Sequence, residues 1–285
     1  AIGRDVAAPL DLKPELGALA VCEIVTENMA NAARVHAMEL GKTVEDYTLI
    51  AFGGAAPLHA ARLADKLGIG RVVIPVSASV GSALGFLTAP VAFQAVRSWY
   101  QLLATLDAAG ATRVLDEMAE QASDIVRTAA GHVKLVVTRT AYMRYCGQGH
   151  EIPVTLAPGT LSAKDITGLA KRFETAYRAL YGRTIPGMGV EIMSWSVTVS
   201  TPVKRAPKAR ALPAKKATAV ATRKMLEPRD AKWRNAPVYE RTAMPPGTRI
   251  AGPALIVEDQ TTVVVTGAFH ASIDSLGQIV LERKR

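Results

Sequence analysis

Hydrophobic and polar positions alternate with a helical period in the first forty residues. From Leu16 to Leu40, apolar side chains recur at steps of four and three, which predicts a helix with one buried face. Gly41 is a suitable residue to end this helix. The members of the predicted buried face are Val21, Val25, Met29, Ala32 and Val35.

The next segment changes from a strand pattern to a helix pattern and back. The apolar run Tyr47–Phe52 is rich in β-forming residues and predicts a buried strand. A helix fits Pro57–Leu67, with proline in its first turn and Gly68 at its end. Arg71–Pro75 then predicts a second strand. Strand, glycine turn, helix and strand in this order form an α/β unit.

After Pro90 the pattern becomes that of an α+β region. A long polar helix is expected at Leu106–Ala130, followed by extended segments at Val133–Tyr145 and Glu151–Leu156. A capping-box pattern at Ser162–Asp165 begins a further helix, which ends at Tyr181-Gly182.

The last hundred residues are richer in strands. Val190–Val203 predicts a strand that places Trp195, Val197 and Val199 on one face. Short strands between Gly and Pro turns follow at Pro237–Tyr239, Ala254–Val257, Thr261–Val265 and Gln278–Leu281. The sequence shows no internal repeat.

Length and composition indicate a globular protein. The 285 residues are 49% hydrophobic and 21% charged, enough for two ordinary domains. No apolar run approaches the roughly 20 residues that span a bilayer, and the N-terminal residues lack a secretory signal pattern. Cys22 and Cys146 lie far apart and form no C-x-x-C pattern. We therefore expect a cytoplasmic protein without membrane contact.

The positive charge is concentrated in one segment. The net charge is +9, and residues 204–224 carry eight basic side chains and no acidic one. These are Lys204, Arg205, Lys208, Arg210, Lys215, Lys216, Arg223 and Lys224. Their neighbours are mainly Ala and Pro, so the aromatic platform of a single-strand binder is lacking. We interpret the segment as a solvated basic Ala/Pro/Lys connector and expect no nucleic-acid partner.

The stretch Leu49–His59 contains the most informative turn. A buried strand leads through Gly53-Gly54 into a helix, so the backbone can approach a flat or anionic ligand without interference from a Cβ atom. The turn is neither a P-loop, because no Gly-Lys-Ser/Thr follows, nor a dinucleotide G-x-G-x-x-G fingerprint. A tight strand-to-helix turn without a ligand remains the alternative interpretation.

The wider sequence resembles the hydantoinase A and oxoprolinase family. Three motifs in order carry the resemblance: Asn28-Met-Ala30 with Phe52–Ala60 and Ser82–Gly85, then Arg144–Gln148 followed by Glu151, then the closing strands. The closing motif comprises Pro237–Arg241, Gly252–Glu258 and Thr261–Val264. The family usually has Gly where this chain has Ala56, a departure that narrows the backbone freedom there.

The resemblance implies an α/β fold class and a division into parts. Residues 1–95 would be the C-terminal part of an actin-like (ribonuclease H-like) nucleotide-binding domain. Residues 96–203 would form an α+β domain, 204–224 the basic connector, and 225–285 a β-rich C-terminal segment. The family's Asp-x-Gly-Gly-Thr phosphate loop does not occur in these 285 residues.

The resemblance also implies a nucleotide site. Gly53, Gly54, Ala55 and Ala56 would contact the adenosine side of ATP, and Asn28 would face the same cleft. A satisfied amide on a helix is the alternative for Asn28. Magnesium would be held mainly by the part that carries the phosphate loop, and the catalytic residues are unknown.

Three further residues are candidates for contacts with substrate or partner. His59 lies early in the helix after the turn, where an imidazole could meet a phosphate or substrate oxygen, or could pack against the turn. Arg144 and Gln148 belong to the second motif, and a structural hydrogen-bond network is an equal alternative for them.

Other chemistries have little support in the sequence. The remaining histidines show no metal-ligand spacing, so we expect no metal site formed by this chain alone. Ser79 and Ser82 are outside any G-x-S-x-G elbow, and Cys146 has only Arg144 nearby to activate it.

The resemblance implies an enzyme component that uses ATP to phosphorylate a carbonyl or enol oxygen of a small-molecule substrate. We expect ring opening of a cyclic amide, as in hydantoinases and oxoprolinases, with ketone carboxylation of the acetone or acetophenone type as the alternative. The expected partners are an N-terminal phosphate-loop part and a second large hydantoinase B-type subunit. A non-catalytic binding or assembly module is the third possibility, and the isolated chain is expected to be inactive.

Overall fold

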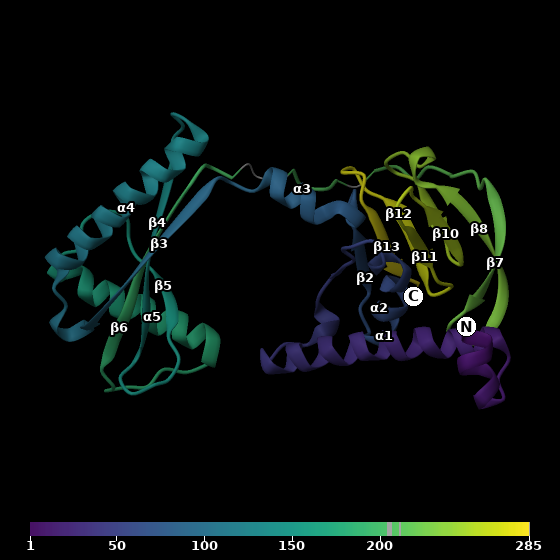
Figure 1. Cartoon of the computed structure of the whole chain (residues 1–285), viewed down its shortest axis with the longest axis horizontal. Helices are drawn as coiled ribbons and strands as arrows, with labels where there is room; N and C mark the ends of the chain where they lie inside the picture. Colours follow the sequence, from purple (N-terminus) through teal and green to yellow (C-terminus); the bar gives the residue numbers. More distant parts are fainter. Residues whose placement is uncertain (204–206, 211, 285) are drawn as a thin grey trace. The chain divides into compact units, whose positions relative to one another are not determined.

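The computed structural model describes residues 1–203, 207–210 and 212–284. For Ala163 and Lys164, which lie within the first range, it describes the backbone but not the side chains. Lys204 and Arg205 of the expected connector lie outside the described residues. The chain divides into two compact units (Figure 1). Unit 1 comprises residues 1–88 and 206–285, and unit 2 comprises residues 89–205.

A five-stranded sheet forms the centre of unit 1. Its strands, in spatial order, are β1 (Leu49–Ile50), β2 (Arg71–Ile74), β13 (Ile279–Arg283), β12 (Phe269–Ile273) and β9 (Arg249–Ala251). β1 and β2 are parallel and are joined through helix α2 (Ala56–Lys66), in the predicted order. The predicted burial of the first strand is wrong, because Ile50 and Phe52 are 64% and 53% exposed. β13 pairs with β2 in antiparallel register, so the end of the chain lies beside the N-terminal strands (Figure 1).

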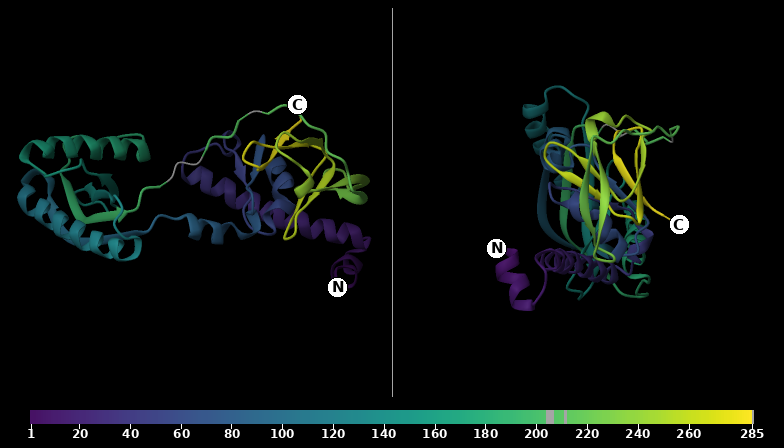
Figure 2. Two further views of the ribbon diagram at one scale, coloured as in Figure 1. Left: turned by 90° about the horizontal axis from the view of Figure 1, so that it is seen from above. Right: turned by 90° about the vertical axis from the view of Figure 1, so that its right-hand side faces the viewer.

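A second sheet of unit 1 covers α2. Its strands, in spatial order, are β11 (Thr262–Val265), β10 (Ala254–Val257), β8 (Lys232–Glu240) and β7 (Ala221–Glu227). Figure 2 shows β7 and β8 in green beside the yellow C-terminal strands. Ala60, Ala61 and Ala64 of α2 are buried in one core with Val263 and Val265 of β11. Their small side chains allow the helix to lie close to the strand.

Residues 215–224 of the expected connector are bound to unit 1. Lys215 forms a bridge with Thr248, in which its N–H donates to the Gly247 carbonyl at 2.9 Å. β7 begins at Ala221 and pairs with β8. The segment without regular structure therefore ends before residue 224, the end that the composition suggests. Backbone hydrogen bonds to β8 hold residues 221–224 in place, although these residues have few apolar side chains to bury.

The first long helix is α1 (Pro14–Glu39), close to its predicted bounds. The prediction of its buried face is wrong: Val21, Val25 and Val35 are 37%, 42% and 55% exposed. The buried side chains of α1 are instead small, at Thr26 and Ala30. The apolar period correctly indicates a helix, but it does not reveal which side packs on α2.

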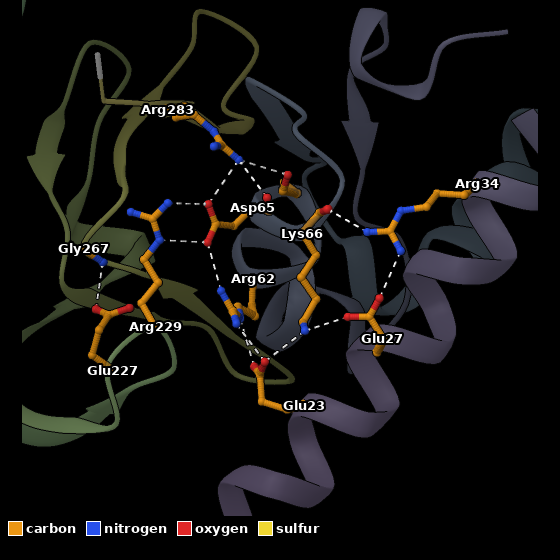
Figure 3. A network of polar contacts seen from close by, with 11 residues as sticks. Glu23, Glu27, Arg34, Arg62, Asp65, Lys66, Glu227, Arg229, Gly267 and Arg283 are labelled. Atoms are coloured by element: carbon orange, nitrogen blue, oxygen red, sulfur yellow. Dashed lines mark hydrogen bonds and ion pairs between the residues drawn. The ribbon is translucent and has the colours of Figure 1, made fainter.

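Polar contacts fix α1 on α2 (Figure 3). Arg62 of α2 donates to Glu23 of α1 at 2.7 and 2.9 Å, and Lys66 contacts Glu27 at 2.8 Å. The side chain of Asp65 is 7% exposed, and its carboxylate oxygens form ion pairs with the guanidinium groups of Arg62, Arg229 and Arg283. The N···O distances are 2.9 to 3.2 Å. The end of α2 is thereby connected to the β7–β8 turn and to β13.

Unit 2 consists of one antiparallel sheet and two long helices. The strands, in spatial order, are β3 (Ala92–Leu102), β6 (Val190–Ser200), β4 (Val136–Tyr145) and β5 (Ile152–Thr155). The helices are α4 (Ala108–Ala130) and α5 (Ala163–Tyr181). Trp195, Val197 and Val199 are fully buried in one core with residues of both helices, which confirms their predicted face.

The predicted ends of α5 are confirmed in detail. The Ser162 N–H donates to the Asp165 carboxylate at 2.8 Å, and Gly182 at the other end has φ of +72°. Among the α-helices and strands of the described residues, helix α3 (Gly81–Thr88) and the strands β3, β7, β9 and β12 were not predicted. α3 and β3 are largely exposed, although α3 carries the apolar residues Leu84, Phe86 and Leu87. Across the ranges described above, no helix is long and apolar enough to cross a membrane.

Candidate functional site: the glycine turn of unit 1

The glycine turn lies where β1 ends and α2 begins. Because β1 and β2 are parallel neighbours, the loops that follow them lie at the same edge of the sheet. Ligands of parallel α/β sheets bind at this carboxyl edge. The Gly53 N–H donates to the Ala78 carbonyl at 2.9 Å, so the loop after β1 is bonded to the loop after β2.

The two glycines of the turn differ in conformation. Gly53 has φ of +110°, a backbone conformation that favours glycine over other residues. Gly54 has no positive φ, and a Cβ atom built there would meet only the Gln260 carbonyl oxygen, at 4.0 Å. The chain itself therefore leaves room for a side chain at Gly54, and the lack of one keeps this backbone open.

The turn between β10 and β11 closes one side of the site. The Thr261 hydroxyl donates to the Gly54 carbonyl at 2.6 Å. The Ser79 hydroxyl donates to Oε1 of Gln260 at 2.9 Å. A segment about 200 residues away in the sequence is thus fixed to both loops at the carboxyl edge.

A cavity of about 510 Å³ is lined by the loop after β2 and by the β10–β11 turn, the segments bonded to the glycine turn, but not by residues 53–56. It is formed by the segments 76–80, 240–242 and 257–260. Its size is within the range of small-molecule sites. Three half-exposed valines line it, Val76, Val80 and Val257, so it offers apolar surface next to polar groups.

Charged groups of opposite sign line the same cavity. Arg241 donates to the backbone carbonyl oxygens of Met244, at 2.9 Å, and of Gly277. Burial raises the pKa of the Glu258 carboxyl; the charge of Arg241 opposes this rise and that of Asp259 adds to it. A carboxyl whose pKa is perturbed inside a cavity is a functional candidate.

Of the residues named from the sequence for adenosine, Gly53–Ala56 form this turn, whereas Asn28 is next to Glu27, which contacts Lys66 at the other end of α2. Ala55 is the N-cap of α2 and offers no side-chain cap, and Ala56 is the first residue of the helix. His59 follows on α2 and is partly exposed. Asn28 lies on α1 and is exposed, without a side-chain hydrogen bond to the residues that the structure describes.

Arg144 and Gln148 lie in the other unit. Nε of Arg144 donates to Glu191 at 2.6 Å, and the Tyr100 hydroxyl donates to the second oxygen of Glu191 at 2.9 Å. Nε2 of Gln148 donates to the Tyr177 hydroxyl at 2.8 Å. Both side chains are thus engaged by contacts inside unit 2.

These contacts shift the pKa values of Glu191 and Tyr100. The Arg144 guanidinium lowers the pKa of Glu191, with a further contribution from the Tyr100 hydroxyl, and together they outweigh the effect of burial. The same contact with Glu191 raises the pKa of Tyr100. Glu191 is therefore an ionised partner that holds Arg144 in place.

Sequence analysis did not identify Glu258, Gln260 and Thr261 as site residues. Glu258 and Thr261 belong to the third motif of closing strands, and Gln260 lies between its last two segments. Only folding brings Thr261 to Gly54 and Gln260 to Ser79. The third motif could have indicated this turn, because polar residues between two short apolar strands are typical of a turn. Among the described residues, no group of three or more His, Cys, Asp or Glu side chains could hold a metal ion.

Two family models match the chain. Residues 1–95 match the model described as Hydantoinase/oxoprolinase, and residues 105–283 match the Hydantoinase/oxoprolinase C-terminal domain. The alpha subunit of caprolactamase from Pseudomonas jessenii is 27% identical over 281 residues, covering 96% of this chain and 40% of that protein. The beta subunit of acetone carboxylase from Xanthobacter autotrophicus is 26% identical over 299 residues, covering 96% and 40%.

A solved structure agrees with these similarities. The crystal structure of the ATP-dependent caprolactamase from Pseudomonas jessenii superposes with a TM-score of 0.78 at 26% identity. The match covers 100% of this chain and 42% of that chain. The present chain therefore spans about two fifths of the length of these relatives.

Proposed function

Since the chain belongs to the hydantoinase/oxoprolinase family, as predicted, we propose that it supplies the adenosine-binding side of an ATP-dependent enzyme that opens cyclic amides. The α/β fold class expected from the sequence is confirmed with the family. The observation that carries the proposal is the open Gly54 backbone at the carboxyl edge of β1 and β2, beside the cavity.

The turn offers different groups to the adenosine and to the phosphates of ATP. Adenosine can lie against Gly53 and Gly54, because no side chain covers that backbone. The uncapped N–H groups of α2 at Ala55 and Ala56 face the same turn and favour the negative charge of a phosphate. His59 would contact the nucleotide or substrate from α2, whereas the place of Asn28, beside Glu27 at the Lys66 end of α2, does not support such a contact.

The remaining parts of the active site would come from other polypeptide segments. An N-terminal part with an Asp-x-Gly-Gly-Thr loop would hold the phosphates and magnesium, for which the described residues of this chain offer no cluster of ligands. A second large hydantoinase B-type subunit would complete the reaction. The isolated chain should then release no phosphate from ATP in a steady-state assay.

The role of ATP would be to phosphorylate the carbonyl oxygen of the substrate, which makes an amide easier to attack. The family description names hydantoinase and oxoprolinase, and the alpha subunit of a caprolactamase is among the relatives, so a cyclic amide is the favoured substrate class. The similarity to an acetone carboxylase subunit supports ketone carboxylation as the second candidate. A non-catalytic binding role is the third, because the phosphate loop is lacking from these residues.

A single substitution tests the proposal. Gly54→Val places a branched side chain where the structure leaves space, so the fold should tolerate it while the side chain blocks adenosine. Gly70→Val is the matched control: Gly70 has no positive φ, meets no atom within 4 Å, and precedes β2 at the opposite edge of the sheet.

ATP affinity and melting temperature should be measured together on the complex that contains this chain. We expect Gly54→Val to weaken ATP binding at least tenfold with a small change in melting temperature, and Gly70→Val to change neither. Unchanged ATP affinity in a folded Gly54→Val complex would remove the main support for the proposal.

A further inference from the structure

The cavity beside the glycine turn has a wall made by the β10–β11 turn. Thr261 and Gln260 bond this turn to Gly54 and Ser79, at 2.6 and 2.9 Å. The Glu258 N–H also donates to the Thr261 carbonyl at 2.9 Å, which closes the turn on itself. Glu258 is therefore held at a fixed position relative to the backbone that faces the nucleotide.

The carboxylate of Glu258 is free to accept hydrogen bonds. Arg241, the arginine of the same cavity, directs its donors to the Met244 and Gly277 carbonyls. Within the described ranges, Glu258 has neither an ion pair within 4.0 Å nor a side-chain hydrogen bond. A partly buried carboxylate without such partners is costly to keep for stability alone.

The charge of the cavity decides which part of ATP it can take. Glu240, Glu258 and Asp259 outnumber Arg241 along its lining, so a triphosphate would be repelled. A neutral nucleoside is not repelled, and its base can contact Val76, Val80 and Val257. The phosphates would instead point to the uncapped N-terminus of α2, where the helix dipole favours negative charge.

We infer that Glu258 is a specificity-determining residue that accepts hydrogen bonds from the ribose hydroxyls of the nucleotide bound at the glycine turn. A carboxylate is well suited to this role, since it has two acceptor oxygens and a ribose diol has two donors. The inference rests on the proposed function of this site. It adds a residue of the C-terminal strands to a site that the sequence places around Gly53 and Gly54.

The experiment compares nucleotides that differ in one hydroxyl. Dissociation constants of ATP, 2′-deoxy-ATP and 3′-deoxy-ATP are measured on the complex that contains this chain, for the wild type and for Glu258→Gln. Glu240→Gln is the matched control, because Glu240 lines the same cavity but lies on the exposed end of β8. Melting temperatures show that each variant is folded.

The wild type should bind ATP about tenfold or more tightly than at least one of the deoxy analogues, since each analogue lacks one of the two hydroxyls that can donate to the carboxylate. Glu258→Gln should lose most of this preference and Glu240→Gln should keep it. The inference is overturned if the wild type binds ATP and both deoxy analogues equally, or if Glu258→Gln keeps the preference for ATP. In either case tight ATP binding leaves the proposed function standing. A wild type that binds no ATP overturns both.

Discussion

Gly53 and Gly54 are adjacent, yet each is glycine for a different physical reason. Gly53 adopts φ of +110°, so any other residue there would strain the backbone, with or without a ligand. Gly54 has no such constraint and no neighbour closer than 4.0 Å to a built Cβ atom. The sequence alone could not separate these two reasons, because both appear as the same pair of letters. Only Gly54 is a clean test of ligand contact.

Also at the residue scale, substituting Arg144 can distinguish a structural role from a role in binding substrate or a partner. The ion pair between Arg144 and Glu191 is mostly buried, with side chains 24% and 8% exposed. Arg144→Ala would leave the Glu191 carboxylate without its cation, and we expect it to lower the unfolding free energy by about 2 kcal/mol, between the values for buried and surface pairs. Denaturant unfolding measures this, with exposed Arg183→Ala as the control.

The pH dependence of this effect has a definite sign. The pKa of Glu191 is lowered in the fold, so its stabilising contribution is present above the pKa of an unfolded glutamate and is lost as the pH falls through the lowered value. The difference between wild type and Arg144→Ala should therefore shrink on acidification. Unchanged stability together with lost turnover would instead assign Arg144 to substrate or partner.

At the scale of elements, α2 is the helix on which the site depends, because it begins at the glycine turn. Its far end is held by Asp65, which contacts arginines of α2 itself, of the β7–β8 turn and of β13 (Figure 3). This cluster fixes the direction of α2 relative to both sheets of unit 1. The position of the glycine turn thus follows partly from contacts at the opposite end of the helix.

Asp65→Asn should therefore destabilise unit 1. The substitution leaves Arg62, Arg229 and Arg283 close together without the shared carboxylate, and we expect a loss of about 3 kcal/mol, the lower end of the range for broken buried pairs because Arg229 is 58% exposed. Thermal or denaturant unfolding measures the loss. Asp230→Asn, which removes an exposed pair with Arg234, should have little effect. Equal stability of the two variants would mean that the cluster does not hold α2.

The sequence predicted elements better than their partners. The periods at Leu16–Leu40 and Val190–Val203 identify a helix and a strand, and the capping residues locate the ends of α5. The packed side of α1 was wrong, because an apolar stripe shows which side chains favour burial but not which surface is available. Ion pairs and small residues decide that contact, and neither leaves a periodic hydrophobic signal.

At the scale of the whole molecule, the family could be recognised from three motifs in order, but their places in space could not. The first and third motifs meet in unit 1, where Thr261 bonds to Gly54, whereas Arg144 and Gln148 belong to unit 2. The pairing of β13 with β2 joins residues more than 200 positions apart. No local pattern encodes such a pairing, so Glu258 and its turn could not be assigned to the site beforehand.

The central claim is that this chain binds the adenosine part of ATP at the glycine turn, and labelling tests it most directly. The complex that contains the chain is irradiated with an azidoadenosine triphosphate, and the labelled peptides are identified by mass spectrometry. The account predicts label on this chain in the segments 76–80 or 257–260, which line the cavity, and loss of that label with excess ATP. Label confined to other chains, or label here that excess ATP does not remove, would contradict it.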